Sequence, residues 1–338
     1  MEETEKQLTT QQVFLKKLES IIPRTSSLAS ELSDVLNISS DSAYRRIRGE
    51  TLLTIEEAVI LCNHFKISLD SIQSTEPGIV TFRYNLLYDN EQSFIEYMKS
   101  LKKDLMVINS SKERRIIYAC EDIPIFHNFN YPVLSAFKIF YWLKSIMNVP
   151  SLQGETFETS KISDEVKQLG REIYDLYASV PCIEIWTETT IMGTLKQIEF
   201  YWDSGSFKSK EDALEVCNAL KEELLSIQKQ AEAGHKFSSA GPSLNDTNLY
   251  SMYHCEIEIT NNCVLVDMGD VQSVYLGHFS FNTMSTTNIS YCKETEFWLS
   301  NIIKKSTLIS GIAEKHRYKY FKKAFTMLDG VISKIESD

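Results

Sequence analysis

The clearest pattern of apolar and polar positions lies near the N-terminus, between residues 27 and 72. The apolar residues at i, i+4 and i+8 of a first helix are Leu28, Leu32 and Leu36. Ser26 or Ser27 can cap this helix, because a hydroxyl accepts an unpaired backbone N–H. Asn37 tolerates the left-handed backbone that ends a helix, and Ile38 returns to the core. The pattern predicts a helix followed at once by a tight turn.

A second, shorter helix is predicted from residue 41 to residue 48, where Gly49 ends it. Ala43 and Ile47 lie one turn apart and should face inward. The residues then predicted to face outward, together with the preceding turn, are Ser39, Ser40, Ser42, Tyr44, Arg45, Arg46 and Arg48. Arginine can hold guanine with two hydrogen bonds, and serine reaches phosphates. These seven residues are therefore the candidate DNA-binding set.

Three further helices are predicted around this pair. One runs from Gln11 to Ile22, with Val13, Leu15 and Leu18 available to the core, and Pro23 stops it. A second follows Thr54 and Glu57, whose spacing is that of a capping box. Its apolar positions are Ala58, Leu61, Cys62 and Phe65. A last short helix, capped by Ser68, extends to Ile72.

This stretch resembles the phage-repressor-like (XRE-type) helix-turn-helix family over roughly residues 9–72. The resemblance is carried by residues 32–39, by Arg48-Gly49 and by residues 65–70. It implies a five-helix domain and a homodimeric bacterial transcription regulator. Two departures are Ser33, where the family usually has alanine, and Arg46, where an apolar residue is common. The choice of base readers among Tyr44, Arg45 and Arg46 therefore stays open.

Beyond residue 78 the pattern mixes helical and strand periods. Helices are predicted over residues 91–108, 131–147, 164–178, 187–202, 209–233, 293–304 and 312–335. Strands are predicted over residues 79–84, 115–120, 182–186, 250–260, 263–268 and 271–281. Asn261-Asn262 suggests a hairpin turn, so the last three strands should form an antiparallel meander.

These elements predict an all-α five-helix helix-turn-helix domain at residues 1–74 and a mixed α/β or α+β region at residues 78–338. The polar segment 73–78 ends in Pro-Gly and reads as a linker. Residues 234–248 are rich in glycine, proline, serine and asparagine, and they either subdivide the second region or form an insertion within it.

Composition modifies this picture in three ways. The net charge is −11, and residues 1–72 carry eight basic against eleven acidic side chains, so any attraction to phosphate must be local. Seven cysteines without a Cys-x-x-Cys pair favour reduced thiols in a cytoplasmic protein. The sequence has no apolar run of about 18 residues, the length that would predict a membrane span.

Three weaker signals remain in the second region. The residues that could form a metal site are His254, Cys255, Cys263 and His278, but their spacing matches no ligand pattern, and we expect no metal. Aromatic residues gather over residues 131–142 and 186–202 and suggest core, an effector pocket or a dimer interface. The stretch 306–317 offers a helix N-terminus with Lys315 and Arg317, which could bind an anionic effector or be an ordinary capped helix.

No glycine-rich phosphate loop, Gly-x-Ser-x-Gly elbow or zinc motif occurs in the sequence, so we expect no catalytic residue and no cofactor. The leading hypothesis is a sequence-specific DNA-binding transcription regulator whose second region senses a ligand or dimerises. Two alternatives remain open. One is an enzyme tethered to DNA by its helix-turn-helix, and the other is a helical module that docks another protein.

Overall fold

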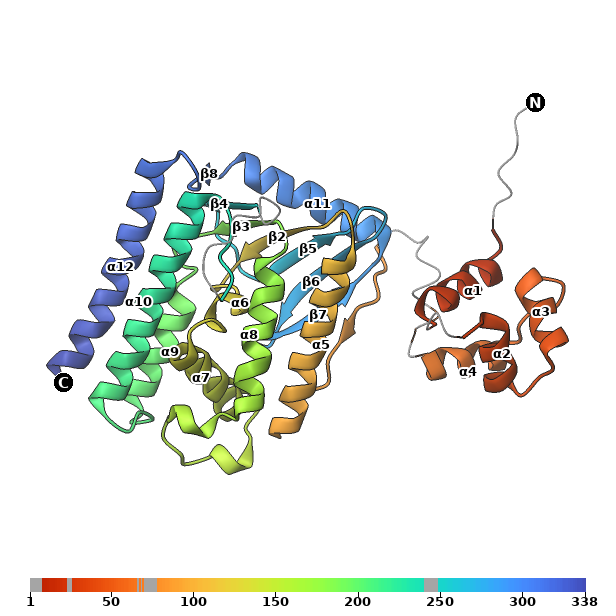
Figure 1. Ribbon diagram of the computed structural model, residues 1–338, viewed down its shortest axis with the longest axis horizontal. Helices are drawn as coiled ribbons and strands as arrows, with labels where there is room; N and C mark the ends of the chain where they lie inside the picture. The colour runs from red at the N-terminus through yellow and green to blue at the C-terminus, as the bar shows by residue number, and fades with distance from the viewer. Residues whose placement is uncertain (1–7, 23–25, 66, 68, 70–77, 240–248) are drawn as a thin grey trace. The chain divides into compact units, whose positions relative to one another are not determined.

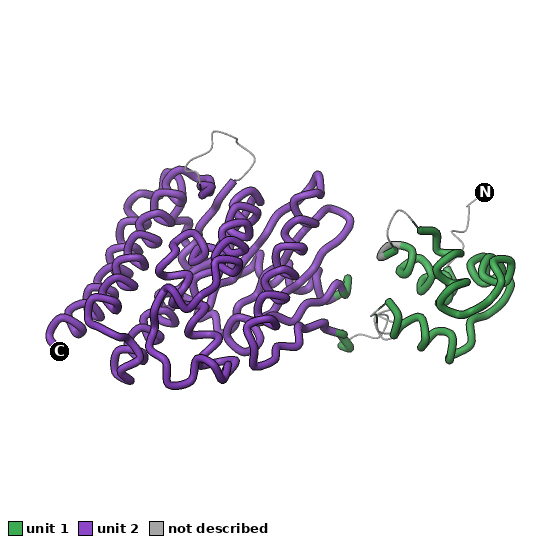
Figure 2. Tube along the Cα trace, turned by 60° about the horizontal axis from the view of Figure 1, so that its bottom comes forward, with its two compact units in different colours: residues 1–81, 288–290 green, residues 82–287, 291–338 purple. Residues whose placement is uncertain are grey.

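The computed structural model divides the chain into two compact units (Figure 2). Unit 1 comprises Met1–Thr81 with Asn288–Ser290, and unit 2 comprises Phe82–Thr287 with Tyr291–Asp338. The structure describes residues 8–22, 26–65, 67, 69, 78–239 and 249–338. Among these residues, no helix combines the length and the apolar character that crossing a membrane requires.

The described part of unit 1 is helical. Its helices are α1 (Thr10–Ile21), α2 (Leu28–Leu36), α3 (Ser40–Arg48) and α4 (Ile55–Phe65). The side chains that form its core are Phe14, Leu15, Leu18, Leu28, Leu32, Ala43, Leu61 and Cys62. The expected fifth helix falls largely on positions 68 and 70–72, which lie outside the described residues.

Local capping explains where these helices begin and end. Ser27 caps α2 by accepting from Ser30 N, and Asn37 ends it with a φ of 52°. Thr54 and Glu57 form the predicted capping box, with bonds of 3.0 and 3.1 Å. One core prediction was wrong: Val13 is 39% exposed, because the first helix turns the neighbouring Phe14 inward instead.

Unit 2 is built on an 8-stranded sheet with the order β1-β7-β6-β5-β2-β3-β4-β8. The strands are β1 (Arg83–Tyr84), β2 (Arg115–Cys120), β3 (Cys182–Trp186), β4 (Tyr250–His254), β5 (Cys263–Asp267), β6 (Gln272–His278), β7 (Asn282–Thr286) and β8 (Thr307–Leu308). Strands β2, β3 and β4 are parallel, and the other pairings are antiparallel. The whole fold is therefore mixed α/β.

The described part of unit 2 has eight α-helices, several of them longer than any in unit 1. They are α5 (Glu91–Ser110), α6 (Ile125–Asn128), α7 (Pro132–Tyr141), α8 (Asp164–Ala178), α9 (Met192–Asp203), α10 (Lys210–Ala233), α11 (Ile289–Lys304) and α12 (Glu314–Ser337). A π-helical turn, η2 (Trp142–Ile146), extends α7, and η3 (Pro150–Leu152) and η4 (Thr159–Lys161) are short 3₁₀ turns.

Both faces of the sheet are covered. Along β2, Ile116, Tyr118 and Cys120 join a large core with α5, α7, α8, α9, α10 and α12. Ile117 and Ala119 point to the opposite face, where α11 packs. This alternation follows from the two-residue period of a strand. Figure 1 shows α5, α8 and α10 lying across one face of the sheet.

Two predictions for unit 2 were wrong. The hairpin across Asn261-Asn262 does not form, because β4 pairs with β3 and β8 whereas β5 pairs with β2 and β6. The antiparallel meander instead runs through β5, β6 and β7. The helix predicted over 187–202 begins only at Met192, since Thr187 and Thr190 form a turn held by the Thr190 hydroxyl.

Unit 2 buries a charged network in its core. Glu184 on β3 is fully buried and accepts four hydrogen bonds, at 2.6 to 2.9 Å. The donors are His127, Tyr177, Trp186 and Tyr250. Burial alone would raise the pKa of Glu184, but the charge and hydrogen bond of His127, with smaller contributions from Lys236 and Tyr177, lower it to about 2. The network thus holds an ionised carboxylate inside the core.

A second buried acid lies nearby on α10. Glu223 is fully buried and accepts a 2.8 Å hydrogen bond from Asn128 Nδ2. Its other oxygen, Oε2, has no hydrogen-bond partner among the described residues. Burial raises the pKa of Glu223 to about 7, although the Asn128 bond opposes the shift.

Candidate nucleic-acid interface

The outer face of α3 carries the exposed members of the predicted DNA-binding set. Asp41, Tyr44, Arg45 and Arg48 are all exposed and recur at the three- and four-residue spacing of one helix face. Tyr44 is 50% exposed, and the side chains of Arg45 and Arg48 are 57% and 54% exposed. This face therefore presents an aromatic ring and two guanidinium groups to solvent.

The opposite side of α3 is anchored within unit 1. Ala43 is fully buried against the core, and Ile47 packs against it. Gln11 on α1 adds three hydrogen bonds of 2.8 to 2.9 Å to the backbone at the end of α3 and in the following loop. The backbone groups are Arg46 O, Thr51 O and Leu53 N. These contacts fix which face of α3 is outward.

Arg46 lies differently from the other two arginines. Its guanidinium donates two hydrogen bonds to the Glu57 carboxylate, at 2.6 and 3.1 Å, and a third to Ser42 O. The Arg46 and Glu57 side chains are only 14% and 17% exposed. The Arg46 hydrogen bond lowers the pKa of Glu57, and the Thr54 N–H adds to this effect. Arg46 thus joins α3 to the start of α4.

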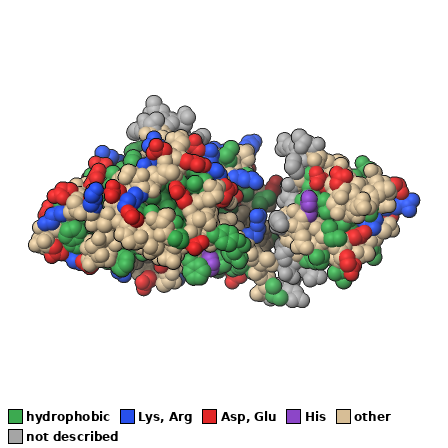
Figure 3. Space-filling model, turned by 90° about the horizontal axis from the view of Figure 1, so that it is seen from below, with side chains coloured by type: hydrophobic (Ala, Val, Ile, Leu, Met, Phe, Trp, Pro, Cys, Tyr) green, Lys and Arg blue, Asp and Glu red, His purple; other side chains and the backbone are tan. Residues whose placement is uncertain are grey.

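The two exposed arginines are also paired with carboxylates. Arg45 Nε lies 3.1 Å from Asp41, and Arg48 Nε lies 2.6 Å from Glu50. The Glu50 hydrogen bond raises the pKa of Arg48, and the same bond lowers the pKa of Glu50. Water screens exposed pairs strongly, so a phosphate can replace either carboxylate at little cost. Figure 3 shows acidic and basic side chains interspersed rather than a broad basic surface.

The three serines lie at the start of α3. Ser39 caps the helix by accepting from Ser42 N at 3.3 Å, and its hydroxyl donates to Ser42 Oγ at 3.0 Å. Ser39 and Ser40 are exposed and Ser42 is half-buried. A helix N-terminus with free backbone N–H groups and hydroxyls is a suitable partner for a phosphate.

The four candidate metal ligands do not come together. His254 ends β4 and Cys255 follows it, whereas Cys263 is on β5 and His278 ends β6. Strands β2 and β3 separate these two groups in the sheet. Across the described part of the chain, no three His, Cys, Asp or Glu side chains form a group suited to a metal ion.

Arg317 in the stretch 306–317 and the buried aromatic residues serve packing, whereas Lys315 is exposed. Arg317 is buried and donates to the carbonyls of Ile309 and Gly311, so its guanidinium closes the loop before α12. In the aromatic segments, Phe137 and Tyr201 pack edge to face in the core. Two residues differ: Phe200 is 56% exposed, and Trp142 also lines a pocket.

The sequence suggested one part of that pocket, because segment 131–142, which contains Lys138 and Trp142, was a candidate for an effector pocket. The pocket lies between α5, the end of β2 and the strands β5 to β7, and its cavity volume is about 110 Å³. Its lining residues come from positions 85 to 283, so no local motif could reveal the whole of it. Glu57 and Gln11, which hold α3 in place, were missed as supports for the same reason: their partners are distant in sequence.

Comparison with known proteins adds no relative. No protein-family model, no curated protein and no solved structure matches this chain. The function is therefore argued from residues and geometry alone.

Proposed function

We propose that this chain is a sequence-specific DNA-binding transcription regulator that acts in the cytoplasm. The observation that carries the proposal is the outer face of α3, where Tyr44, Arg45 and Arg48 are exposed on one side of a helix anchored on the other. A short exposed helix of this kind fits the major groove of B-DNA.

The proposed roles differ along α3. Arg45 is the candidate base reader, because a guanidinium matches guanine O6 and N7, and Tyr44 contacts the base edge beside it. Arg48, Ser39 and Ser40 contact phosphates. Arg46 is assigned to holding α3 on α4 because Glu57 occupies its guanidinium. Ser42, half-buried under the capping bond, supports Ser39.

Affinity must come from few charges. Residues 1–72 have more acidic than basic side chains, so the expected non-specific binding is weak and falls steeply with salt. A homodimer would double the contacts and place two α3 helices on half-sites one helical turn apart. Unit 2 would then supply dimerisation or ligand sensing, with the ligand altering the fit of the two helices to their half-sites.

The test compares three single substitutions in the full chain. Arg45→Ala should lower affinity for a selected site about 5- to 150-fold, because a bidentate base contact contributes about 1–3 kcal/mol. Lys16→Ala removes the same charge from the exposed face of α1 and should change affinity little. Arg48→Ala should weaken binding to all sequences alike. Equal effects of Arg45→Ala and Lys16→Ala would refute the assignment.

A second candidate is a protein-docking module. It is favoured by Leu52 and Ile55, which are 75% and 77% exposed in unit 1, beside Val59 at 43%. If unit 1 docks a protein through these side chains, Leu52→Ser with Ile55→Ser should abolish that complex and leave DNA binding unchanged. Loss of DNA binding in the same variant would instead connect this surface to dimerisation on DNA.

A further inference from the structure

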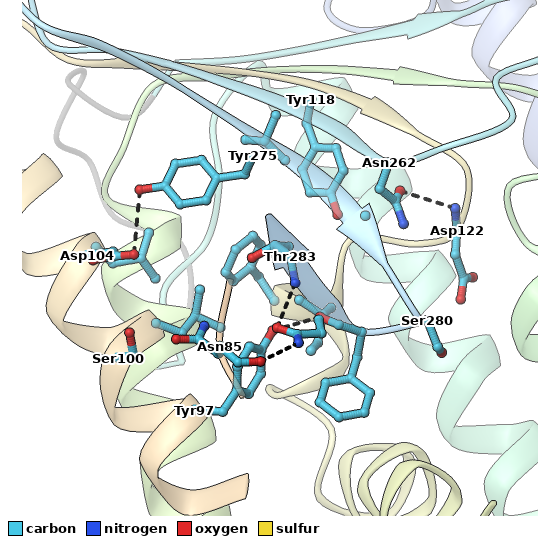
Figure 4. Close-up of a pocket in the computed structure, with 18 of the residues that line it drawn as sticks. Asn85, Tyr97, Ser100, Asp104, Tyr118, Asp122, Asn262, Tyr275, Ser280 and Thr283 are labelled. Carbon is cyan, nitrogen blue, oxygen red and sulfur yellow. Dashed lines mark hydrogen bonds between the residues drawn. The ribbon is translucent and has the colours of Figure 1, made fainter. Parts of the chain in front are cut away.

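The pocket in unit 2 is a concave, mainly apolar site at the helical face of the sheet. Aromatic rings from several elements line it, including Tyr97, Tyr118, Trp142, Tyr275 and Phe281. It adjoins the carboxyl end of β2, and ligands in open α/β sheets bind at the carboxyl ends of strands. Figure 4 shows the Tyr118 hydroxyl directed into this space.

The charged side chains of the lining are two carboxylates and one ammonium group. Asp104 comes from α5 and Asp122 follows β2, and Figure 4 places them on opposite sides of the pocket. Lys138 is almost fully buried and pairs with Asp122 at 3.2 Å while donating to Thr194 at 3.0 Å. Lys138 is thus neutralised within the protein, and it leaves Asp104 as the charge that needs a partner.

Asp104 is poorly satisfied by the protein. The hydrogen bond that the structure gives it comes from the Tyr275 hydroxyl at 3.5 Å, at the limit of such a bond. Its side chain is half-buried, and this burial raises its pKa, although Arg83 and Lys103 oppose the shift. A partly buried carboxylate without a strong donor is costly unless a cation joins it.

A second acceptor on the lining also lacks a donor. Asn128 is fully buried, its Nδ2 is used by Glu223, and its Oδ1 has no partner among the described residues. Leaving a buried acceptor unpaired costs about 1–3 kcal/mol. Asp104 and Asn128 are thus two acceptors on the lining that a ligand donating hydrogen bonds would satisfy.

We propose that this pocket binds a small organic amine with a compact aromatic or aliphatic body. The ammonium group pairs with Asp104 and lies near the face of Tyr275, where cation–π attraction adds to the charge pairing. The body packs among Tyr97, Trp142 and Phe281. Amines with a second N–H or O–H group bind more tightly, because that group reaches Asn128 Oδ1. An anionic ligand is disfavoured, because it would meet Asp104 and Asp122.

The test titrates the full chain with three matched probes by isothermal calorimetry. The probes are phenethylamine, 2-phenylethanol and 3-phenylpropanoate, which share a ring and differ in the charge of the polar end. The amine should bind at least tenfold more tightly than the alcohol, and the acid should bind more weakly than both. Because ammonium binding favours ionised Asp104, amine binding should release protons in acidic buffer.

Variants locate the site. Asp104→Asn should abolish the preference for the amine over the alcohol without abolishing alcohol binding. Asp329→Asn makes the same change on the exposed face of α12 and should leave the preference intact. Ser100→Phe should fill the pocket and weaken all three probes, with circular dichroism confirming that the variant folds.

The inference is overturned if the amine does not bind, if the alcohol or acid binds as tightly, or if Asp104→Asn keeps the preference. Each of these measurements reports ligand binding by unit 2 in the full chain, and none of them uses DNA. If the DNA-binding role of Arg45 is refuted, the amine-binding proposal is therefore unaffected. If the amine-binding proposal is refuted, the DNA-binding role is likewise unaffected.

Discussion

The exposed arginine pairs on α3 of unit 1 contrast with the buried carboxylates in the core of unit 2. In unit 1, Arg45 and Arg48 form exposed pairs at the surface of a helix, where solvent or a ligand can replace their partners. In unit 2, Glu184 and Glu223 are fully buried, one bound by four donors and the other by a single amide. Charges at a surface are free to meet another molecule, whereas buried charges are committed to the fold. This difference is why the proposed function places recognition of an extended anion, DNA, in unit 1.

The largest expected effect is the loss of stability of unit 2 when Glu184 is replaced. Replacing it with alanine leaves four donors, including His127, without their acceptor, and breaking such a buried pair costs about 3–5 kcal/mol. All four tryptophans lie in unit 2, so urea unfolding followed by tryptophan fluorescence reports this unit alone. Glu113→Ala, at an exposed position, is the control and should unfold near the wild-type midpoint.

Glu223 should give the next largest effect, with the opposite sign. Its folded pKa of about 7 lies above the ordinary 4.5, so the folded state binds more protons between these values and stability falls as pH rises through them. The difference corresponds to about 3 kcal/mol. Glu223→Gln should therefore stabilise unit 2 by up to that amount above pH 7 and change little below pH 4.5. Equal stabilisation at both pH values would refute this explanation.

Within unit 1, Arg46 and Arg45 should contribute differently to stability. Arg46→Ala should destabilise unit 1 by about 1–3 kcal/mol, because it removes charge-assisted bonds to Glu57 and leaves that carboxylate partly buried. Arg45→Ala should leave stability nearly unchanged, since its pair with Asp41 is exposed. Hydrogen–deuterium exchange measured by mass spectrometry on peptides from α1 to α4 follows this unit alone. If the Arg46→Ala variant is as stable as the wild type but loses DNA binding, Arg46 contacts DNA directly.

The smallest expected effect is at Glu50. Replacing it with glutamine removes the carboxylate that competes with phosphate for Arg48, so DNA affinity should rise about two- to fivefold at low salt and less at high salt. Fluorescence anisotropy with labelled duplex measures this change. A fall in affinity would mean that Glu50 positions Arg48 for DNA rather than competing with it.

Local signals explain what the sequence could predict. Ser27, Asn37 and the Thr54–Glu57 box are determined by neighbours within a few residues, and the structure has them as predicted. Contacts between residues that are distant in the sequence could not be predicted from it. Asn261-Asn262 suggested a hairpin because turn chemistry is local, whereas strand order depends on the whole sheet. The bond from Arg46 to Glu57 and the pocket around Asp104 are likewise assembled from separate elements.

The central claim is that the outer face of α3 reads duplex DNA. The most direct measurement is selection of bound duplexes from a random pool by the full chain, carried out at about 50 and 200 mM salt, the range over which phosphate contacts weaken most visibly. If the outer face of α3 reads duplex DNA, a single motif should be enriched at both salt concentrations and bound more tightly at the lower one. The Arg45→Ala variant should not enrich this motif. Recovery of no common motif at either concentration would contradict the claim.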